Sequence, residues 1–187
     1  GVWAGDLMLG DTPKALKRRK KLMGVEARGR LWKHSTLADI EGLVSRDEMQ
    51  EMLCFTLVRN PWDRIVSYYH WLKVQSFEHP AVATAKTLGF SDFLRAPAVA
   101  GPIKTHPYES YLRASDGRSR EALYIRLEHF AEDAAPLMEH LGFELDLPRA
   151  NASVREGDYR RYFSADDSEV VAELCAEDIE KFSYSFD

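Results

Sequence analysis

One stretch near the middle of the chain joins two hydrophobic patterns, and we expect it to organise the fold. Residues 53–58 form a nearly continuous apolar run, which is typical of a short strand buried on both faces of a parallel sheet. After Arg59, Asn60 is a favourable helix N-cap and Pro61 a favourable first helical residue. From residue 62 to residue 72 the apolar positions recur every three or four residues. The pattern therefore predicts a strand, a tight turn and a helix.

The predicted junction suits an anion. In open α/β sheets, ligands bind at the carboxyl ends of strands, where helix N-termini present N–H groups that lack partners. Arg59 lies at this point, and Ser67 follows two turns into the helix. A guanidinium and a hydroxyl that face one spot suit a phosphate group. The alternative is that Arg59 forms a surface ion pair beside an ordinary capped helix. Arg64 has the same two interpretations, a ligand contact or an ion pair.

Further helices and a second strand are predicted along the chain. Helix starts are expected at a capping residue that is followed by proline or, three positions later, by an acid: Thr12-Pro13, Thr36 with Asp39, Ser45 with Glu48, and Ser164 with Asp167. The apolar run 122–127 predicts a strand, and one helix is expected from about residue 130 to residue 141, where Gly142 ends it. The predicted fold class is α/β, a parallel sheet flanked by helices.

Length and cysteine content lead to expectations about the number of domains and the cellular location. At 187 residues we expect one domain, and no window approaches the apolar length of a membrane span. Cys54 and Cys175 fall in predicted core elements and are interpreted as buried thiols, which fits a reducing compartment. We therefore expect a cytoplasmic location. No cluster of residues has the spacing of metal ligands, so no metal is expected.

The net charge of −5 hides an uneven distribution. Residues 14–33 carry nine of the 25 basic residues and one of the 30 acidic residues. A basic segment on an acidic body points to an anionic ligand or partner. The basic helix expected over residues 14–23 has three interpretations: a solvated face, an electropositive wall for a sulfated or acidic acceptor, or a nucleic-acid contact. Nucleic acid is least favoured, because no aromatic residues interleave with the basic ones.

Residues 53–69 resemble the 3′-phosphate-binding motif of the sulfotransferases that use 3′-phosphoadenosine 5′-phosphosulfate (PAPS). The family pattern is an Arg at the strand end, a Pro two residues later, and a Ser eight residues after the Arg, before aromatic residues. These positions are Arg59, Pro61 and Ser67. The resemblance, which extends more weakly from Trp32 to the end, implies a P-loop-like parallel sheet. It also implies metal-independent transfer of a sulfuryl group from PAPS, as co-substrate, to an acceptor hydroxyl, for which a carbohydrate is expected.

The resemblance implies roles for residues outside the motif. In Golgi-type carbohydrate sulfotransferases, a histidine between the first phosphate loop and the central strand acts as the base. His34 lies in a similar place, and its alternative role is that of a surface or capping histidine. Residues 151–155 match a loop that closes over the nucleotide in related enzymes. Ser153 and Arg155 are therefore expected to contact the donor.

One part of the family pattern is not found. The family has an earlier strand and a loop rich in Lys, Gly, Ser and Thr that cradles the 5′-phosphosulfate. Residues 1–5 are too short for both, and no buried strand is predicted before residues 10–13. We therefore expect the domain spanning residues 1–187 to be N-terminally incomplete, to transfer little sulfate and to self-associate or aggregate. Rival functions are a non-catalytic module that binds a nucleotide or an acidic polymer, and a nucleotide kinase, which lacks its Walker loop here.

Overall fold

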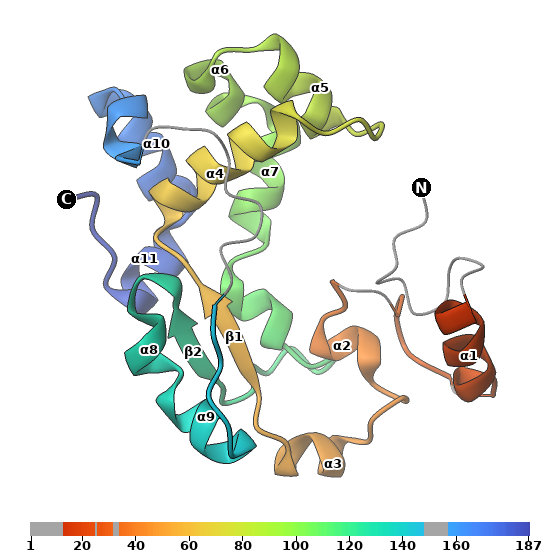
Figure 1. Cartoon of the computed structure of the whole chain (residues 1–187). Coiled ribbons are helices and arrows are strands. Elements are labelled where there is room, and N and C mark those ends of the chain that lie inside the picture. The colour runs from red at the N-terminus through yellow and green to blue at the C-terminus, as the bar shows by residue number, and fades with distance from the viewer. Residues whose placement is uncertain (1–12, 25, 32–33, 148–156) are drawn as a thin grey trace. The chain divides into compact units, whose positions relative to one another are not determined.

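The computed structural model describes residues 13–24, 26–31, 34–147 and 157–187. The chain divides into two compact units: unit 1 comprises residues 1–54 and 108–123, and unit 2 comprises residues 55–107 and 124–187. Within the described residues the protein is mostly helical, with one parallel sheet of two strands (Figure 1). The α/β class is thus confirmed at this coarse level. No helix in the described part of the chain is long and apolar enough to cross a bilayer.

Unit 1 is built from short helices. They are α1 (Pro13–Leu22), α2 (Leu37–Ile40), α3 (Arg46–Glu51) and the 3₁₀ helix η1 (Tyr108–Leu112). The predicted capping boxes at Thr36 and Ser45 are both present, each with a reciprocal side-chain bond from the acid three residues later. Helix α1 begins at Pro13 as predicted, while its predicted cap, Thr12, lies outside the described residues.

A hairpin over residues 113–119 completes unit 1. Its strands meet in an antiparallel bridge between Arg113 and Ser119, and Gly117 adopts φ +82° in the turn. The buried carboxylate of Glu41 holds the hairpin, because it accepts hydrogen bonds from the Ser115 hydroxyl and from the Ser115 N–H at 2.9 Å. These bonds, together with a hydrogen bond from Arg28 and the charge of Arg46, lower the pKa of Glu41 to about 2 despite its burial. The carboxylate therefore stays ionised at neutral pH.

Unit 2 contains the sheet and most of the longer helices. Its elements are β1 (Phe55–Val58), α4 (Pro61–Lys73), α5 (Pro80–Thr87), α6 (Phe90–Arg95), α7 (Pro97–Thr105), β2 (Leu123–Arg126), η2 (Leu127–His129), α8 (Phe130–Asp133), α9 (Ala135–Leu141), η3 (Tyr159–Tyr162), α10 (Ala165–Leu174) and α11 (Ala176–Phe182). Both predicted strands and the predicted helix after Asn60 are confirmed. The predicted helix start at Ser164 is also confirmed by a complete capping box with Asp167.

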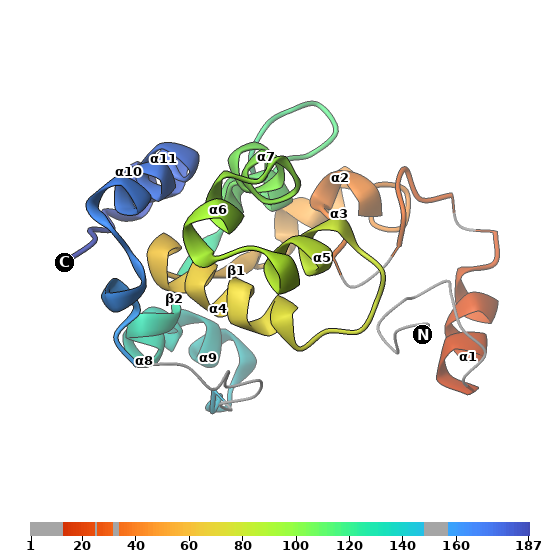
Figure 2. The same cartoon turned by 90° about the horizontal axis from the view of Figure 1, so that it is seen from above.

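Helix α4 is the centre of the core of unit 2. Its buried side chains pack with those of α5, α6, α7 and α10: Trp62, Ile65, Tyr69, Leu72, Ala81, Val82, Ala85, Phe93, Leu94, Val99, Val171 and Cys175. Figure 2 shows α5, α6 and α7 gathered beside α4. Full burial of a large apolar side chain such as Phe93 contributes about 1.5–3 kcal/mol. The core thus fixes α4, and with it the turn that precedes α4.

The structure corrects two expectations about these elements. Strand β1 is not buried on both faces: Val58 is fully buried, but Phe55 is 48% exposed and Leu57 is 40% exposed. Side chains alternate across a strand, so β1 presents one face to the interior and one outward. The single helix expected from residue 130 to Leu141 is two helices, α8 and α9. The break precedes Pro136, whose ring clashes with the carbonyl four residues earlier and which donates no helical hydrogen bond.

Candidate phosphate-binding junction between strand β1 and helix α4

The turn between β1 and α4 is fixed by the side chain of Asn60. Its Oδ1 accepts hydrogen bonds from the N–H groups of Trp62 at 3.1 Å and of Asp63 at 3.4 Å. Pro61 occupies the first turn, where its missing N–H costs nothing. Arg59 therefore lies in a short connection between the end of the strand and the start of the helix.

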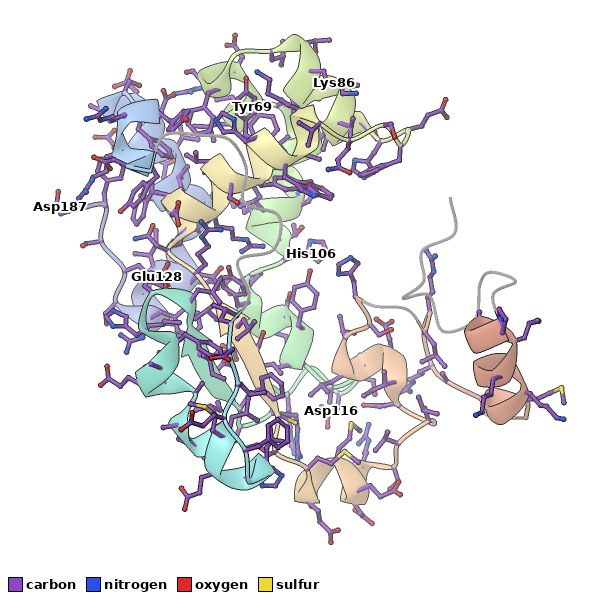
Figure 3. All side chains as sticks on the ribbon, in the orientation of Figure 1. Tyr69, Lys86, His106, Asp116, Glu128 and Asp187 are labelled. Carbon is purple, nitrogen blue, oxygen red and sulfur yellow. The ribbon has the colours of Figure 1, made fainter. Side chains whose placement is uncertain are left out.

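Contacts from distant residues hold the same turn. The Asn60 N–H donates to Oε1 of Glu128 at 2.6 Å, just after the end of β2, and the Tyr184 hydroxyl donates to Oε2 of Glu128 at 3.1 Å. The Asn60 Nδ2 group donates to the Ser185 carbonyl oxygen at 3.0 Å. Figure 3 shows Glu128 beside the turn that leads from β1 into α4. The junction is thus tied to the neighbouring strand and to the C-terminal segment.

Arg59 forms an ion pair with Asp63, one helical turn away. Its Nε donates to Oδ2 of Asp63 at 2.7 Å, and its Nη2 lies 2.6 Å from the same oxygen. The two side chains are 26% and 19% exposed, so both remain accessible. A guanidinium has five N–H donors, and this pair engages two of its nitrogens. The ion-pair interpretation of Arg59 therefore describes the structure, and the unengaged donors remain for a second acceptor.

Ser67 lies one turn beyond Asp63 on the same face of α4. It is half-buried, and its hydroxyl makes no hydrogen bond to any residue that the structure describes. Arg59, Asp63 and Ser67 therefore follow one another along one face of the first two helical turns. The motif residues Arg59 and Ser67 are brought to this face together, and an acidic side chain lies between them.

Arg64 points to a different partner. Its Nη1 lies 3.8 Å from Oδ2 of Asp178, whose side chain is 4% exposed. This supports the ion-pair interpretation of Arg64, because a buried carboxylate needs a compensating charge.

Burial raises the pKa of the Tyr68 hydroxyl, and it raises the pKa of the Cys175 thiol to about 11. Cys175 is therefore a protonated core thiol, as predicted, and Cys54 is only half-buried.

The other predicted site residues are not brought to this junction by anything in the structure. His34 is an exposed residue of unit 1, two positions before the Thr36 cap, whereas Arg59 and Ser67 belong to unit 2. Ser153 and Arg155 lie outside the described residues. The roles of all three residues remain predictions.

The sequence reasoning missed a second arginine at the same edge of the sheet. Arg126 is the last residue of β2, and its Nε and Nη2 donate to the two carboxylate oxygens of Asp133 at 2.7 and 2.9 Å. These bonds lower the pKa of Asp133 to about 2 and raise the pKa of Arg126. The signal was present, since Arg126 lies near the end of the second apolar run, where a parallel neighbour of β1 also ends.

Comparisons of the chain with protein-family models, with curated proteins and with solved structures give no match. Within the described residues, no three side chains of His, Cys, Asp or Glu converge in a way that could hold a metal ion. The chemistry of the junction must therefore be argued from its own geometry. That geometry is an arginine at the end of a strand, an N-capped helix and a serine two turns along the helix.

Proposed function

We propose that the β1–α4 junction binds the 3′-phosphate of a nucleotide, and that the protein is a PAPS-dependent sulfotransferase acting on a hydroxyl acceptor, with a carbohydrate as the expected class. The observation that carries the proposal is the placement of Arg59 and Ser67. Arg59 lies just after a parallel strand and contacts Asp63 in the first turn of α4, and Ser67 lies one turn beyond Asp63 on the same helix face. A helix N-terminus and a guanidinium favour a phosphate dianion through the helix dipole and through charge-assisted hydrogen bonds.

In the proposed reaction, the residues of this chain bind the donor and accept a proton. Arg59 and Ser67 hold the 3′-phosphate and so fix the donor for in-line attack. The acceptor hydroxyl loses its proton to His34 as its oxygen bonds to sulfur. The bond between sulfur and the bridging phosphate oxygen then breaks, and 3′,5′-adenosine diphosphate leaves. Protonated His34 later returns the proton to water.

The first test is whether the 3′-phosphate is recognised. Calorimetric titration of the chain with 3′,5′-adenosine diphosphate and with adenosine 5′-monophosphate compares two ligands that differ by that group alone. We expect the diphosphate to bind at least about tenfold more tightly, because the two contacts to a charged phosphate are lost with the monophosphate. Equal affinities for the two nucleotides would refute a 3′-phosphate site.

Asp63 gives a sharper prediction, because its carboxylate competes with a phosphate for Arg59. Asp63→Asn keeps the shape of the side chain and removes the charge 2.6 Å from the Arg59 guanidinium. We expect 3′,5′-adenosine diphosphate to bind about threefold more tightly or better, since an anion near the phosphate is removed. Calorimetry measures the change.

Asp92→Asn is a matched control for the Asp63 substitution, because Asp92 is also an acid in the first turn of a unit 2 helix. It should leave nucleotide affinity unchanged. Unchanged or weaker binding by Asp63→Asn would mean that Asp63 orients Arg59 and does not compete with the ligand.

A second candidate function is a non-catalytic module that binds a nucleotide through the same junction. The ion pair between Arg59 and Asp63 favours it, because an arginine already paired with a carboxylate resembles a structural element. The sheet of two described strands also offers no loop for the 5′-phosphosulfate among the described residues. The two functions differ in turnover: both predict recognition of the 3′-phosphate, and only the transferase moves sulfate from PAPS to an acceptor.

A further inference from the structure

Unit 1 contains a cavity of about 270 Å³ that the proposed nucleotide site does not use. Helix α3 and the hairpin of residues 113–120 form its walls. Figure 3 labels Asp116 at the turn of this hairpin. The lining residues are Arg46, Met49, Gln50, Ala114, Asp116, Arg118, Ser119 and Arg120. Because the cavity lies wholly within unit 1, its geometry is that of one compact body.

The walls of the cavity are held in place from both sides. Glu41 binds the hairpin through Ser115 and also lies 3.8 Å from the guanidinium of Arg46 on α3. On the other side, the Arg120 Nη2 group donates to the Met49 carbonyl oxygen at 2.9 Å, which links the hairpin to the end of α3. A ligand would therefore meet a preformed site and would not have to order it first.

The residues that line the cavity carry more positive than negative charge. Three arginines line it, against the single carboxylate of Asp116. That carboxylate is already engaged, because it lies 3.6 Å from Arg46 and accepts the Arg118 N–H at 3.0 Å. Two formal positive charges remain. A cavity with this balance attracts anions and excludes cations.

Two of the arginines also have unused donors. The side chain of Arg118 makes no hydrogen bond or ion pair with the described residues, and it is exposed. The Arg120 guanidinium has one described acceptor, the Met49 carbonyl oxygen, and its buried Nε has none among the described residues. Buried polar groups almost always have a partner, so Arg120 retains donor capacity beside the cavity that it lines. Guanidinium groups are suited to oxyanions, which they bind through paired N–H donors.

We propose that this cavity binds an oxyanion, a sulfate or phosphate group, through Arg118 and Arg120, with Ser119 as an additional donor. The shared chemistry is a tetrahedral group with at least three acceptor oxygens, either as a free ion or as an ester on a small organic molecule. The volume equals that of about nine water molecules, which admits the group together with part of a sugar ring. The inference does not rest on the nucleotide site, whose residues belong to unit 2.

The test is a calorimetric titration of the whole chain at low salt with inorganic sulfate, inorganic phosphate, glucose 6-sulfate, glucose 6-phosphate and glucose. We expect the charged probes to bind and glucose not to bind. Arg118→Gln should weaken binding about tenfold or more, because a charge-assisted contact is lost. The affinity of Arg118→Lys should lie between those of the wild type and Arg118→Gln, since lysine keeps the charge and loses the planar guanidinium. Arg118 is exposed, so these variants should fold, which circular dichroism verifies.

Two controls separate a built site from general attraction of anions. Lys20→Gln removes one positive charge from an exposed position of α1 in the same unit, outside the cavity, and should leave affinity unchanged. Arg160→Ala removes an exposed arginine of unit 2, outside the cavity, and should also leave affinity unchanged. Binding of the esters alone would identify an organic ester as the ligand, and binding of the inorganic ions as well would identify the oxyanion as sufficient. Absence of binding by every charged probe, or equal losses in Arg118→Gln and Lys20→Gln, would overturn the proposal.

Discussion

Replacing Arg59 by alanine should weaken the binding of 3′,5′-adenosine diphosphate by about 2 kcal/mol, which is about 30-fold in Kd. Arg59 lies directly after β1, and its guanidinium retains donors beyond those engaged by Asp63. A hydrogen bond between two charged groups is stronger than a neutral one, and the half-buried position reduces screening by salt. The loss should be smaller for adenosine 5′-monophosphate, which has no 3′-phosphate.

The same experiment needs a variant that loses a similar arginine elsewhere. Arg160→Ala is suitable, because Arg160 also belongs to unit 2 and forms an exposed ion pair, with Asp158 at 2.8 Å. Exposed ion pairs contribute about 0–1 kcal/mol, so both variants should remain folded. Isothermal titration of the wild type, Arg59→Ala and Arg160→Ala measures the three affinities. If Arg59→Ala binds the nucleotide as the wild type does, the strand-end arginine is only a partner of Asp63 and the motif carries no function.

The parts of the fold that sequence predicts well are governed by neighbours within four residues. The capping boxes at Thr36, Ser45 and Ser164 are all present, and Asn60 caps α4 as expected. Each cap requires a short polar side chain and an N–H two or three positions later, and both are visible in the sequence. Boundaries that depend on caps are therefore predictable to within a residue or two.

The parts that sequence predicts poorly depend on partners far along the chain. An apolar run such as residues 53–58 indicates a strand, but its burial depends on what covers each face, and Phe55 and Leu57 are exposed. The pairing of Arg64 with Asp178 joins residues 114 positions apart. The bond from Asn60 to Glu128 likewise depends on the pairing of β1 with β2. No local pattern specifies such contacts.

The candidate site likewise has one part that the sequence predicts and one part that it does not. Its local half is the placement of Arg59 just before α4 and of Ser67 two turns into it, which follows from the eight-residue spacing between them. The spacing does not reveal that Asp63, which shares a helix face with Ser67, pairs with the arginine. Charge on the same face decides whether a motif residue is available to a ligand. A three-residue motif therefore predicts where its residues lie along the chain. The structure is needed to show whether their side chains are available to a ligand.

In an enzyme that also contains the 5′-phosphosulfate loop, replacing His34 by alanine should lower the rate of sulfate transfer from PAPS by about 10²–10⁴-fold, the usual effect of losing a general base. Nucleotide affinity should not change, because the proposed contacts to the 3′-phosphate are made by Arg59 and Ser67 and the proposed role of His34 is to accept the acceptor's proton. His34→Ala should thus lose turnover and keep its affinity for the nucleotide, whereas Arg59→Ala should lose affinity for the nucleotide. His34 is exposed, so its removal creates no cavity and the variant should fold.

The measurement is the transfer of radiolabelled sulfate from PAPS to a panel of carbohydrates that carry unmodified hydroxyls, with calorimetry of 3′,5′-adenosine diphosphate on the same samples. His140→Ala is the matched control, since His140 is also an exposed histidine and lies in α9 of unit 2. Turnover of His34→Ala that equals that of His140→Ala would assign the proton to another group. If that complete enzyme transfers no sulfate as wild type or as either variant, but still binds the 3′-phosphate nucleotide selectively, the protein is the non-catalytic module.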